Sequence, residues 1–378
     1  MRILFLINPY SIHDQKWISF FTDKEKYECY FITLSEQKDL KSINQFSITN
    51  NITYLGNVEY VSIRRPIKTI RKLLFIKKIV REHGINLFHI QYAEPNVLWA
   101  CFRSTINIPI IVTCRGTDVL QTIPSHFKKK DILNRIIQKL YKSAFNKVDH
   151  ITVTSIKQKK AIELLSQTST KISLIRTGIN YEEIQIQKES KINKKLEKEY
   201  LLFPRYIKPI YRHEFTLEAL KRLPNSIKKN YQMVFVGKDG GDLKYQQDLL
   251  NIFNQNLDLD IIFLPQQSQS EILFLILNAS IVIMNPISDG SPVSAMEAIA
   301  SNTPVILGPL DYDTDIFNDK TVFKLKEWSE DELSNTIIEI LAKKEGKEII
   351  SSKIIDLIDR NTNMKKLEGI YFDINEIK

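Results

Sequence analysis

The chain has 378 residues, and 53 lysine and arginine residues against 44 aspartate and glutamate residues give it a formal net charge of +9. Hydrophobic residues make up 43% and charged residues 26%. This composition is that of a globular protein and excludes the disordered, fibrous and membrane-bundle classes. The length suits two domains, each of somewhat less than about 200 residues.

The cysteines and the N-terminal residues indicate the cellular compartment of the protein. The three cysteines are far apart in the sequence and odd in number, so they predict neither a disulfide framework nor a metal site and favour a reducing compartment. No apolar run approaches the ~18 residues that a membrane span needs. The apolar residues 3–7 are followed by polar residues 8–11 without a signal-like cleavage site. We therefore expect a buried first strand and a protein that is not secreted.

Charge is distributed unevenly between the two halves. Residues 1–200 carry 33 basic and 18 acidic side chains, a balance of +15, whereas residues 201–378 carry 20 and 26, a balance of −6. A lysine-rich composition throughout would predict no such contrast. The asymmetry indicates an anionic partner for the first half: nucleic acid, a phospholipid surface or an anionic substrate.

Short apolar runs alternate with longer amphipathic stretches along the whole chain, which predicts parallel α/β sheets. In the first half we expect strands at residues 2–7, 28–34, 86–91, 108–113, 150–155 and 171–175, and helices at residues 68–83, 128–147 and 156–165. In the second half we expect strands at residues 201–203, 232–237, 261–264, 280–285 and 304–308. The helices there are predicted at residues 214–222, 242–255, 271–278, 293–300 and 331–343.

A densely charged run near the middle marks the join, because such a segment cannot bury itself. We predict a first domain at residues 1–185, a charged linker at 186–200 and a second domain at 201–350. Residues 351–378 are expected to form a helical tail that packs back on the first domain. Two α/β domains of this kind place ligands beyond the carboxyl ends of their strands.

The most informative segment follows the strand expected at 280–285. Small polar residues lead to Pro292, which suits the first turn of a helix, so the amides of residues 290–294 are expected to cradle an anion at the positive helix end. Asp289 and Glu297 would repel a phosphate but accept hydrogen bonds from sugar hydroxyls. The pattern predicts a nucleotide-sugar site. The alternative is a capped helix whose Glu297 faces solvent.

This segment resembles the acidic-x7-Glu motif of the retaining glycosyltransferases of family 4, which have the GT-B fold. Further segments agree with that family in order and spacing. The Arg115-Gly116-Thr117-Asp118 turn is similar to its His-Gly-x-Asp turn. Residues 148–155 resemble its Ala-Asp-x-Ile-x-x-x-Ser strand, residues 175–180 its Pro-Asn-Gly-Ile-Asp signature, and residues 234–237 the Ile-x-Gly strand of its second domain. The resemblance implies an α/β protein with two Rossmann-like domains facing across a central cleft. It implies a hexosyl- or related glycosyltransferase that uses a nucleotide sugar, UDP- or GDP-linked, as donor.

The resemblance also implies roles for residues of the second domain. Glu297 would bind the ribose, and Asp289, an aspartate where the family usually has glutamate, would contact the transferred sugar. Donor-binding residues on the diphosphate side would include Gly290, Ser291, Val293, Ser294 and Gly237.

Basic side chains are needed where the leaving diphosphate gains charge if no metal is there. The family has an arginine and a lysine after the first strand of its second domain. Arg205 matches the arginine, Arg212 is the expected second cation, and Lys208 is its reserve.

Asp-x-Asp pairs occur at residues 258–260 and 311–313. The first precedes its strand, and the second follows the strand at 304–308 and could mimic a metal motif, but the resemblance makes it a variable loop. We therefore expect no essential metal and no other cofactor.

The acceptor side should be formed by loops after the first-domain strands, at residues 8–17, 92–95 and 115–118, with His13, Tyr92, Arg115 and Asp118 as candidates. Arg115 replaces the family's histidine and is a poor proton acceptor. This replacement favours a mechanism in which the leaving phosphate takes the proton of the acceptor.

The segment 64–81 mixes cations with bulky apolar residues, and a second cationic stretch follows at 128–130. A basic amphipathic surface of this kind suits anionic lipid. The alternative is a helix that covers the sheet and has a solvated outer face, and one helix can do both. We expect a cytoplasmic enzyme on the inner face of the plasma membrane, with a saccharide acceptor that is lipid-linked, in the synthesis of surface polysaccharide, capsule or lipopolysaccharide. A catalytically silent GT-B module that binds a nucleotide or glycan is the alternative. Nucleic acid is not an expected partner, because no readout motif accompanies the charge.

Overall fold

The structure, a computed structural model, describes residues 1–34, 39–128, 131–166, 171–189, 196, 198–237, 242–254, 258–289, 291–343 and 350–376. The chain forms two compact units: the first comprises Met1–Thr177 together with Asn361–Lys378, and the second is Gly178–Arg360. The division thus comes before residue 185, where the sequence predicts the first domain to end. The chain returns to the first unit at Asn361, within the tail predicted at residues 351–378.

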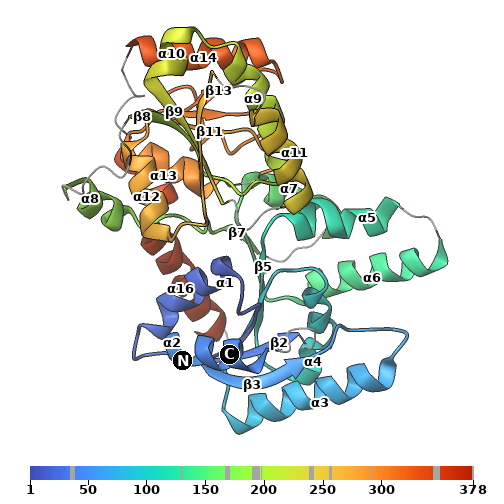
Figure 1. Ribbon diagram of the computed structural model, residues 1–378. Helices are drawn as coiled ribbons and strands as arrows, with labels where there is room; N and C mark the ends of the chain where they lie inside the picture. Colours follow the sequence, from blue (N-terminus) through green and yellow to red (C-terminus); the bar gives the residue numbers. More distant parts are fainter. Residues whose placement is uncertain are drawn as a thin grey trace. The chain divides into compact units, whose positions relative to one another are not determined.

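Seven parallel strands form the sheet of the first unit, in the order β3-β2-β1-β4-β5-β6-β7 (Figure 1). The strands are β1 (Arg2–Leu6), β2 (Glu28–Leu34), β3 (Thr53–Val58), β4 (Leu87–Gln91), β5 (Ile110–Cys114), β6 (His150–Val153) and β7 (Ile172–Leu174). The sequence predicts all of these except β3. Gly56, with a φ of 126°, interrupts the apolar alternation of that edge strand, so its sequence signal is weak.

Helices cover this sheet. They are α1 (Ile12–Thr22), α2 (Leu40–Thr49), α3 (Pro66–Glu82), α4 (Arg103–Ile106), α5 (Ile123–Lys128), α6 (Ile132–Lys147), α7 (Ile156–Ser166) and α16 (Arg360–Glu376). Short 3₁₀ and π-helical turns occupy Asn96–Phe102 and Asp118–Thr122. The helix predicted at 128–147 has a shorter counterpart in α6, because the Asp131 carboxylate accepts a hydrogen bond from the Asn134 amide at 2.9 Å and caps a helix start at Ile132.

Both faces of the first sheet are buried, which explains why its strands are continuous apolar runs. Leu4 and Leu6 of β1 belong to one core cluster, and Ile3 and Phe5 belong to the cluster on the opposite face. Tyr371 of α16 lies fully buried in the second of these clusters. The C-terminal helix is therefore part of the core of the first unit.

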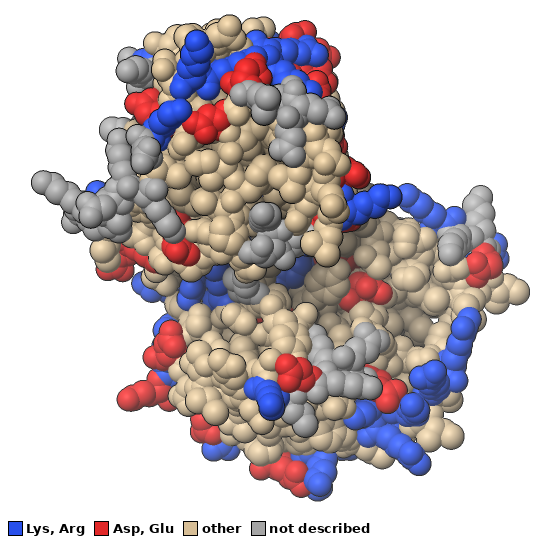
Figure 2. All heavy atoms as spheres, in the orientation of Figure 1, with Lys and Arg blue, Asp and Glu red and all other residues tan. Residues whose placement is uncertain are grey.

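The outer face of α3 carries both apolar and basic residues. Ile67, Ile70 and Leu74 are 67%, 53% and 58% exposed, whereas Ile76 on the inner face is fully buried. Basic residues gather over this helix and the turn before it (Figure 2): Arg64, Arg65, Lys68, Arg71, Lys77, Lys78 and Arg81. Among the residues described, no helix has the length and the apolar character that crossing a bilayer requires.

The second unit contains a six-stranded parallel sheet in the order β10-β9-β8-β11-β12-β13. Its strands are β8 (Glu199–Phe203), β9 (Tyr231–Val236), β10 (Asp260–Leu264), β11 (Ile281–Met284), β12 (Val305–Leu307) and β13 (Phe323–Lys324). Its helices are α8 (Tyr181–Glu189), α9 (His213–Lys221), α10 (Asn225–Asn230), α11 (Leu243–Asn254), α12 (Gln269–Asn278), α13 (Val293–Ser301), α14 (Glu330–Lys343) and α15 (Ser352–Ile358). Helix α8 extends into the segment predicted as a linker, and residues 190–195 and 197 of that segment lie outside the described residues.

Candidate functional site

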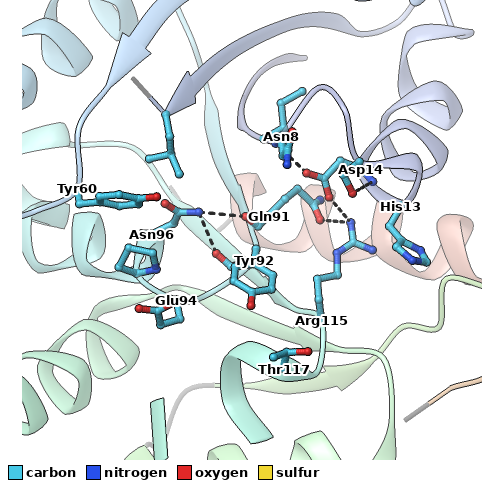
Figure 3. Close-up of a pocket in the computed structure, with 14 residues that line it drawn as sticks. Asn8, His13, Asp14, Tyr60, Gln91, Tyr92, Glu94, Asn96, Arg115 and Thr117 are labelled. Carbon is cyan, nitrogen blue, oxygen red and sulfur yellow. Dashed lines mark hydrogen bonds and ion pairs between the residues drawn. The ribbon is translucent and has the colours of Figure 1, made fainter. Parts of the chain in front are cut away.

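A pocket of about 660 Å³ opens in the first unit at the carboxyl ends of β1, β2, β4 and β5 (Figure 3). Parallel strands end at the same edge of a sheet, so the loops that follow them meet there. Of the four residues predicted for the acceptor side, His13, Tyr92 and Arg115 line the pocket, and Asp118 does not.

Arg115 is the best-anchored side chain of this pocket. Its Nη2 lies 3.1 Å from Oδ1 of Asp14 on α1 and donates a hydrogen bond to Oε1 of Gln91 at 2.5 Å. The guanidinium carbon lies 4.6 Å from the centroid of the Trp17 ring, a cation–π contact. The Arg115 and Asp14 side chains are only 11% and 6% exposed. Burial raises the pKa of Asp14, and the charge of Arg115 opposes that rise.

Asp118 connects two of the loops that form the pocket. Its buried carboxylate accepts backbone hydrogen bonds from Ala93 and Gly116 at 2.8 Å, from Val119 at 2.9 Å and from Arg115 at 3.1 Å. These bonds join the loop after β4 to the turn after β5. Burial nevertheless raises the pKa of Asp118, against these hydrogen bonds. We conclude that Asp118 positions the loops rather than contacting a ligand.

The loop after β4 supplies the opposite wall of the pocket. Tyr92 has a φ of 71°, and burial, assisted by Asp118 and Glu94, raises its pKa to about 12. The Glu94 carboxylate lies 3.4 Å from the Tyr141 hydroxyl and 4.0 Å from His126 Nε2, and burial raises its pKa. Asn96 donates from Nδ2 to the Tyr92 carbonyl at 3.2 Å. Glu94 lies in the loop at residues 92–95 that the sequence predicts for the acceptor side, but neither Glu94 nor Asn96 is among the predicted site residues.

A buried polar chain links this pocket to the C-terminal helix. His89 Nδ1 bonds to the Tyr371 hydroxyl, and its Nε2 lies 2.7 Å from Thr113 Oγ1 and 3.2 Å from Gln91 Nε2. Gln91 in turn bonds to Arg115. Burial lowers the pKa of His89 to about 3, so the imidazole is neutral. The chain thus connects α16 to the arginine of the pocket through strand β4.

In the second unit, the loop after β11 brings two predicted residues together. Arg205, which follows β8, pairs through Nη2 with Oδ2 of Asp289 at 2.5 Å. The Ser291 amide, predicted to face a diphosphate, instead donates to Asp289 Oδ1 at 3.2 Å. Gly290 lies outside the described residues. Tyr312, which was not predicted, lies near this pair. Burial raises the pKa of Tyr312, and the negative charge of Asp289 raises it further.

Helix α13 begins directly after this pair. Val293 and Ser294 occupy its first turn, where backbone amides have no acceptor within the helix. Glu297, on the second turn, is only 4% exposed, and its Oε1 accepts a hydrogen bond from Gln269 Nε2 at 2.7 Å. The alternative of a solvent-facing Glu297 is therefore wrong.

The other predicted donor-side residues make different contacts. The Arg212 guanidinium stacks on Trp328 at 4.2 Å and on Phe215 at 4.8 Å, and Lys208 is exposed, 5.5 Å from the Tyr206 ring. Gly237 has a φ of 88°, and a Cβ there would lie 2.6 Å from Tyr206. Among the cations predicted, Arg205 is thus the one in contact with Asp289. No cluster of three or more histidine, cysteine, aspartate or glutamate side chains suited to a metal occurs within the described part of the chain.

Two protein-family models match the chain. Residues 2–155 match the model described as "Glycosyl transferase 4-like", and residues 185–355 match "Glycosyl transferases group 1". The chain belongs to the group 1 glycosyltransferases. The family and the activity class, glycosyl transfer, that its sequence predicts are thereby confirmed. No protein of curated function matches the sequence.

Solved structures share the fold of this group 1 glycosyltransferase. A glycosyltransferase from Rickettsia africae is similar with a TM-score of 0.76 at 16% identity, over 99% of this chain and 98% of that one. HepE of Anabaena, in complex with UDP-glucose, has a TM-score of 0.69 at 14% identity, over 99% and 100%. The lipopolysaccharide outer core galactosyltransferase WaaB has a TM-score of 0.68 at 12% identity, over 99% of both chains. These similarities confirm the predicted GT-B type of α/β fold.

Proposed function

We propose that this protein is a retaining glycosyltransferase that moves a sugar from a UDP- or GDP-linked donor to a saccharide acceptor. The observation that carries the proposal is the Arg205–Asp289 pair directly before the first turn of α13, with Glu297 buried on the next turn. This segment offers a cation and free amides for a diphosphate beside two carboxylates for hydroxyls. The structures of HepE with UDP and UDP-glucose and of WaaB, whose folds this chain shares, support a nucleotide-sugar donor.

The roles of the donor-site residues follow from their chemistry. Glu297 accepts hydrogen bonds from the ribose hydroxyls, and Asp289 accepts them from the transferred sugar. Arg205 and the amides of Val293 and Ser294 stabilise the negative charge that grows on the leaving phosphate. Because these groups meet that charge, we propose that the reaction needs no metal and no further cofactor.

The transfer itself replaces one bond at the anomeric carbon with another. The bond to the donor phosphate breaks, and its electron pair stays on the phosphate oxygen. The acceptor hydroxyl oxygen bonds to the anomeric carbon from the same face, and its proton passes to that phosphate oxygen. Arg115, at the position of the family's histidine, is permanently protonated at neutral pH and does not compete for this proton.

We further propose that the enzyme is cytoplasmic, binds to the inner face of the plasma membrane, and acts on a lipid-linked acceptor of surface polysaccharide, capsule or lipopolysaccharide. The outer face of α3 supports this location, since it combines exposed Ile67, Ile70 and Leu74 with basic residues (Figure 2). Each lysine or arginine near an anionic membrane contributes about 1 kcal/mol to binding. Lys128, at the start of the second cationic stretch, belongs to the same unit, and residues 129–130 lie outside the described residues.

The test combines turnover with a binding variant. The purified chain is given a panel of UDP- and GDP-sugars with lipid extracts as acceptors, and the anomeric configuration of the product is read by NMR. We expect a product with the anomeric configuration of the donor. Turnover of no donor in the panel would instead support the silent binding module, and an inverted product would refute the retaining mechanism.

Glu297→Ala should lower the affinity for the nucleotide about ten- to a hundredfold, because hydrogen bonds to a charged group contribute about 1.5–3 kcal/mol. Glu339→Ala is the matched control, since Glu339 is an exposed glutamate of the same unit. Unchanged nucleotide affinity in Glu297→Ala would sink the assignment of the ribose site.

A further inference from the structure

The pocket of the first unit differs in charge from the unit that contains it. Residues 1–177 and 361–378 of this unit carry 31 basic and 16 acidic side chains, a balance of +15, yet the formally charged side chains that line the pocket are two carboxylates, Asp14 and Glu94, and one guanidinium, Arg115. The remaining polar groups in the lining are mainly hydroxyls and amides. The positive charge of the unit therefore lies elsewhere, including on the outer face of α3.

The charge of Arg115 is balanced by Asp14 through Nη2, while its Nε and Nη1 are buried without a hydrogen-bond partner in the described part of the chain. Its Nη2 is shared between Asp14 Oδ1 at 3.1 Å and Gln91 Oε1 at 2.5 Å. Asp14 is held in turn, because its Oδ2 accepts the Asn8 amide at 2.9 Å. An anionic ligand that approached Arg115 would meet the Asp14 carboxylate directly beside it. Like charges in a partly desolvated site repel strongly, so this pair opposes the binding of a phosphate or a carboxylate.

Asn96 adds an independent observation. Its side chain lines the pocket and is 7% exposed, and its Oδ1 has no hydrogen-bond partner in the described part of the chain. The orientation of the amide is settled by Nδ2, which donates to the carbonyls of Tyr92 at 3.2 Å and Gln91 at 3.5 Å. A buried carbonyl oxygen without a partner requires a donor. Sugar hydroxyls supply such donors, so Asn96 favours a hydroxyl-rich ligand, and the discrimination against anionic sugars comes from Asp14 and Glu94.

Glu94 on the same wall also accepts hydrogen bonds. Its carboxylate is 21% exposed and borders the pocket, with Oε1 at 3.4 Å from the Tyr141 hydroxyl. Carboxylates bind neighbouring hydroxyls of a sugar well, because both oxygens accept hydrogen bonds. Asn96 and Glu94 thus present acceptors to whatever occupies the pocket.

We propose that this pocket binds an uncharged, hydroxyl-rich sugar unit, and that Asp14 is a specificity-determining residue that excludes uronic acids and sugar phosphates by neutralising Arg115. In the proposed function, on which this identification rests, the unit is the end of the acceptor that receives the transferred sugar. The negative charge of a lipid-linked acceptor then lies outside the pocket.

The test measures sugar binding without turnover. Ligand-observed NMR on the full chain compares glucose, galactose, mannose and N-acetylglucosamine with glucuronate, galacturonate and glucose 6-phosphate. We expect the best neutral sugar to bind at least about tenfold more tightly than the anionic sugar of the same parent, for example glucose compared with glucuronate. Asp14→Asn should lower this preference about tenfold or reverse it, and Asn96→Leu should weaken binding of the neutral sugar about tenfold. Asp23→Asn, an equal charge change at an exposed position of the same unit, should alter neither.

Glu94→Gln covers the case in which Asp14→Asn does not fold, and it should change the preference in the same direction. Tighter binding of an anionic sugar to the wild type would overturn the proposal. So would binding of none of these sugars, or an unchanged preference in the folded Asp14 and Glu94 variants. Binding as predicted in a protein that hydrolyses and transfers no donor would refute the proposed function while leaving this inference intact.

Discussion

Replacing Asp289 by asparagine should change nucleotide binding and catalysis in opposite directions. In the structure, the Asp289 carboxylate occupies Nη2 of Arg205 at 2.5 Å. A diphosphate that binds Arg205 must share this guanidinium with the carboxylate and is also repelled by it. Asparagine keeps an oxygen that can accept the Ser291 amide, so the loop should retain its local hydrogen bond.

The size of the effect follows from the charge that is removed. A unit negative charge about 6 Å from a bound phosphate interacts unfavourably by about 0.7 kcal/mol in water and about 3 kcal/mol at an effective dielectric constant near 20. The Arg205 and Asp289 side chains are 26% and 15% exposed, and solvent reduces the interaction at such partly exposed groups. We therefore expect a gain of about 1 kcal/mol, or about fivefold in UDP affinity.

Isothermal titration calorimetry with UDP, paired with a turnover assay, tests this expectation. Asp289→Asn should bind UDP about fivefold more tightly and turn over the nucleotide sugar about a hundredfold or more slowly, because one stabilising group at the reacting centre is lost. Asp311→Asn, an equal charge change at an exposed position of the same unit, is the control. Weaker or unchanged UDP binding by Asp289→Asn would show that Asp289 orients Arg205 for the diphosphate rather than competing with it.

Three further predictions concern stability and membrane binding. Tyr371→Phe should lower the free energy of unfolding by about 1–3 kcal/mol, since it leaves His89 Nδ1 buried without its partner, and equal denaturation midpoints for the two proteins would contradict this. Burial lowers the pKa of His89 from 6.5 to about 3, so the unfolded chain binds a proton that the folded chain does not. The contribution of His89 to the free energy of unfolding should therefore fall by about 2 kcal/mol from pH 7 to pH 5 and continue to fall towards pH 3. In urea denaturation, the free energy of unfolding of His89→Gln should depend less steeply on pH. Leu74→Glu should reduce co-sedimentation with anionic liposomes while leaving the thermal midpoint unchanged, whereas Ile48→Glu, at an 82% exposed position on α2, should leave both as they are. Equal liposome binding by both variants would show that the outer face of α3 does not contribute to membrane binding.

Much of the donor-side segment was predictable from the sequence because its residues are close together in the chain. A strand end, a polar loop and the first turns of a helix place Asp289, Ser294 and Glu297 on one short segment, so periodicity alone indicates where they lie. Arg205 was also predictable, through its position after the first strand of the second unit. What the sequence could not give was the direct Arg205–Asp289 contact, which depends on β8 and β11 being neighbours in the sheet.

The pocket of the first unit is the opposite case. Three of the predicted acceptor-side residues line it, and Asp14 lies in the segment 8–17 predicted for that side, but Asp14, Gln91 and Asn96 were not singled out as site residues. An aspartate in the first turn of a helix is an ordinary sequence feature, and so is a glutamine at the end of an apolar strand. Their importance comes from contacts between residues far apart in the chain: β4 lies between β1 and β5, and this order brings α1, Gln91 and Arg115 together.

The sequence by itself determined the two α/β sheets, the uneven charge and the glycosyltransferase motifs, because each depends on local periodicity or on short contiguous segments. Only the tertiary structure decided which carboxylate meets which arginine, and that a strongly basic unit contains a pocket whose charged lining is mainly acidic. The physical reason is that strand order and burial govern these contacts. Whether a polar side chain is solvated, paired or left with an unsatisfied acceptor depends on neighbours that lie tens or hundreds of residues away in the chain.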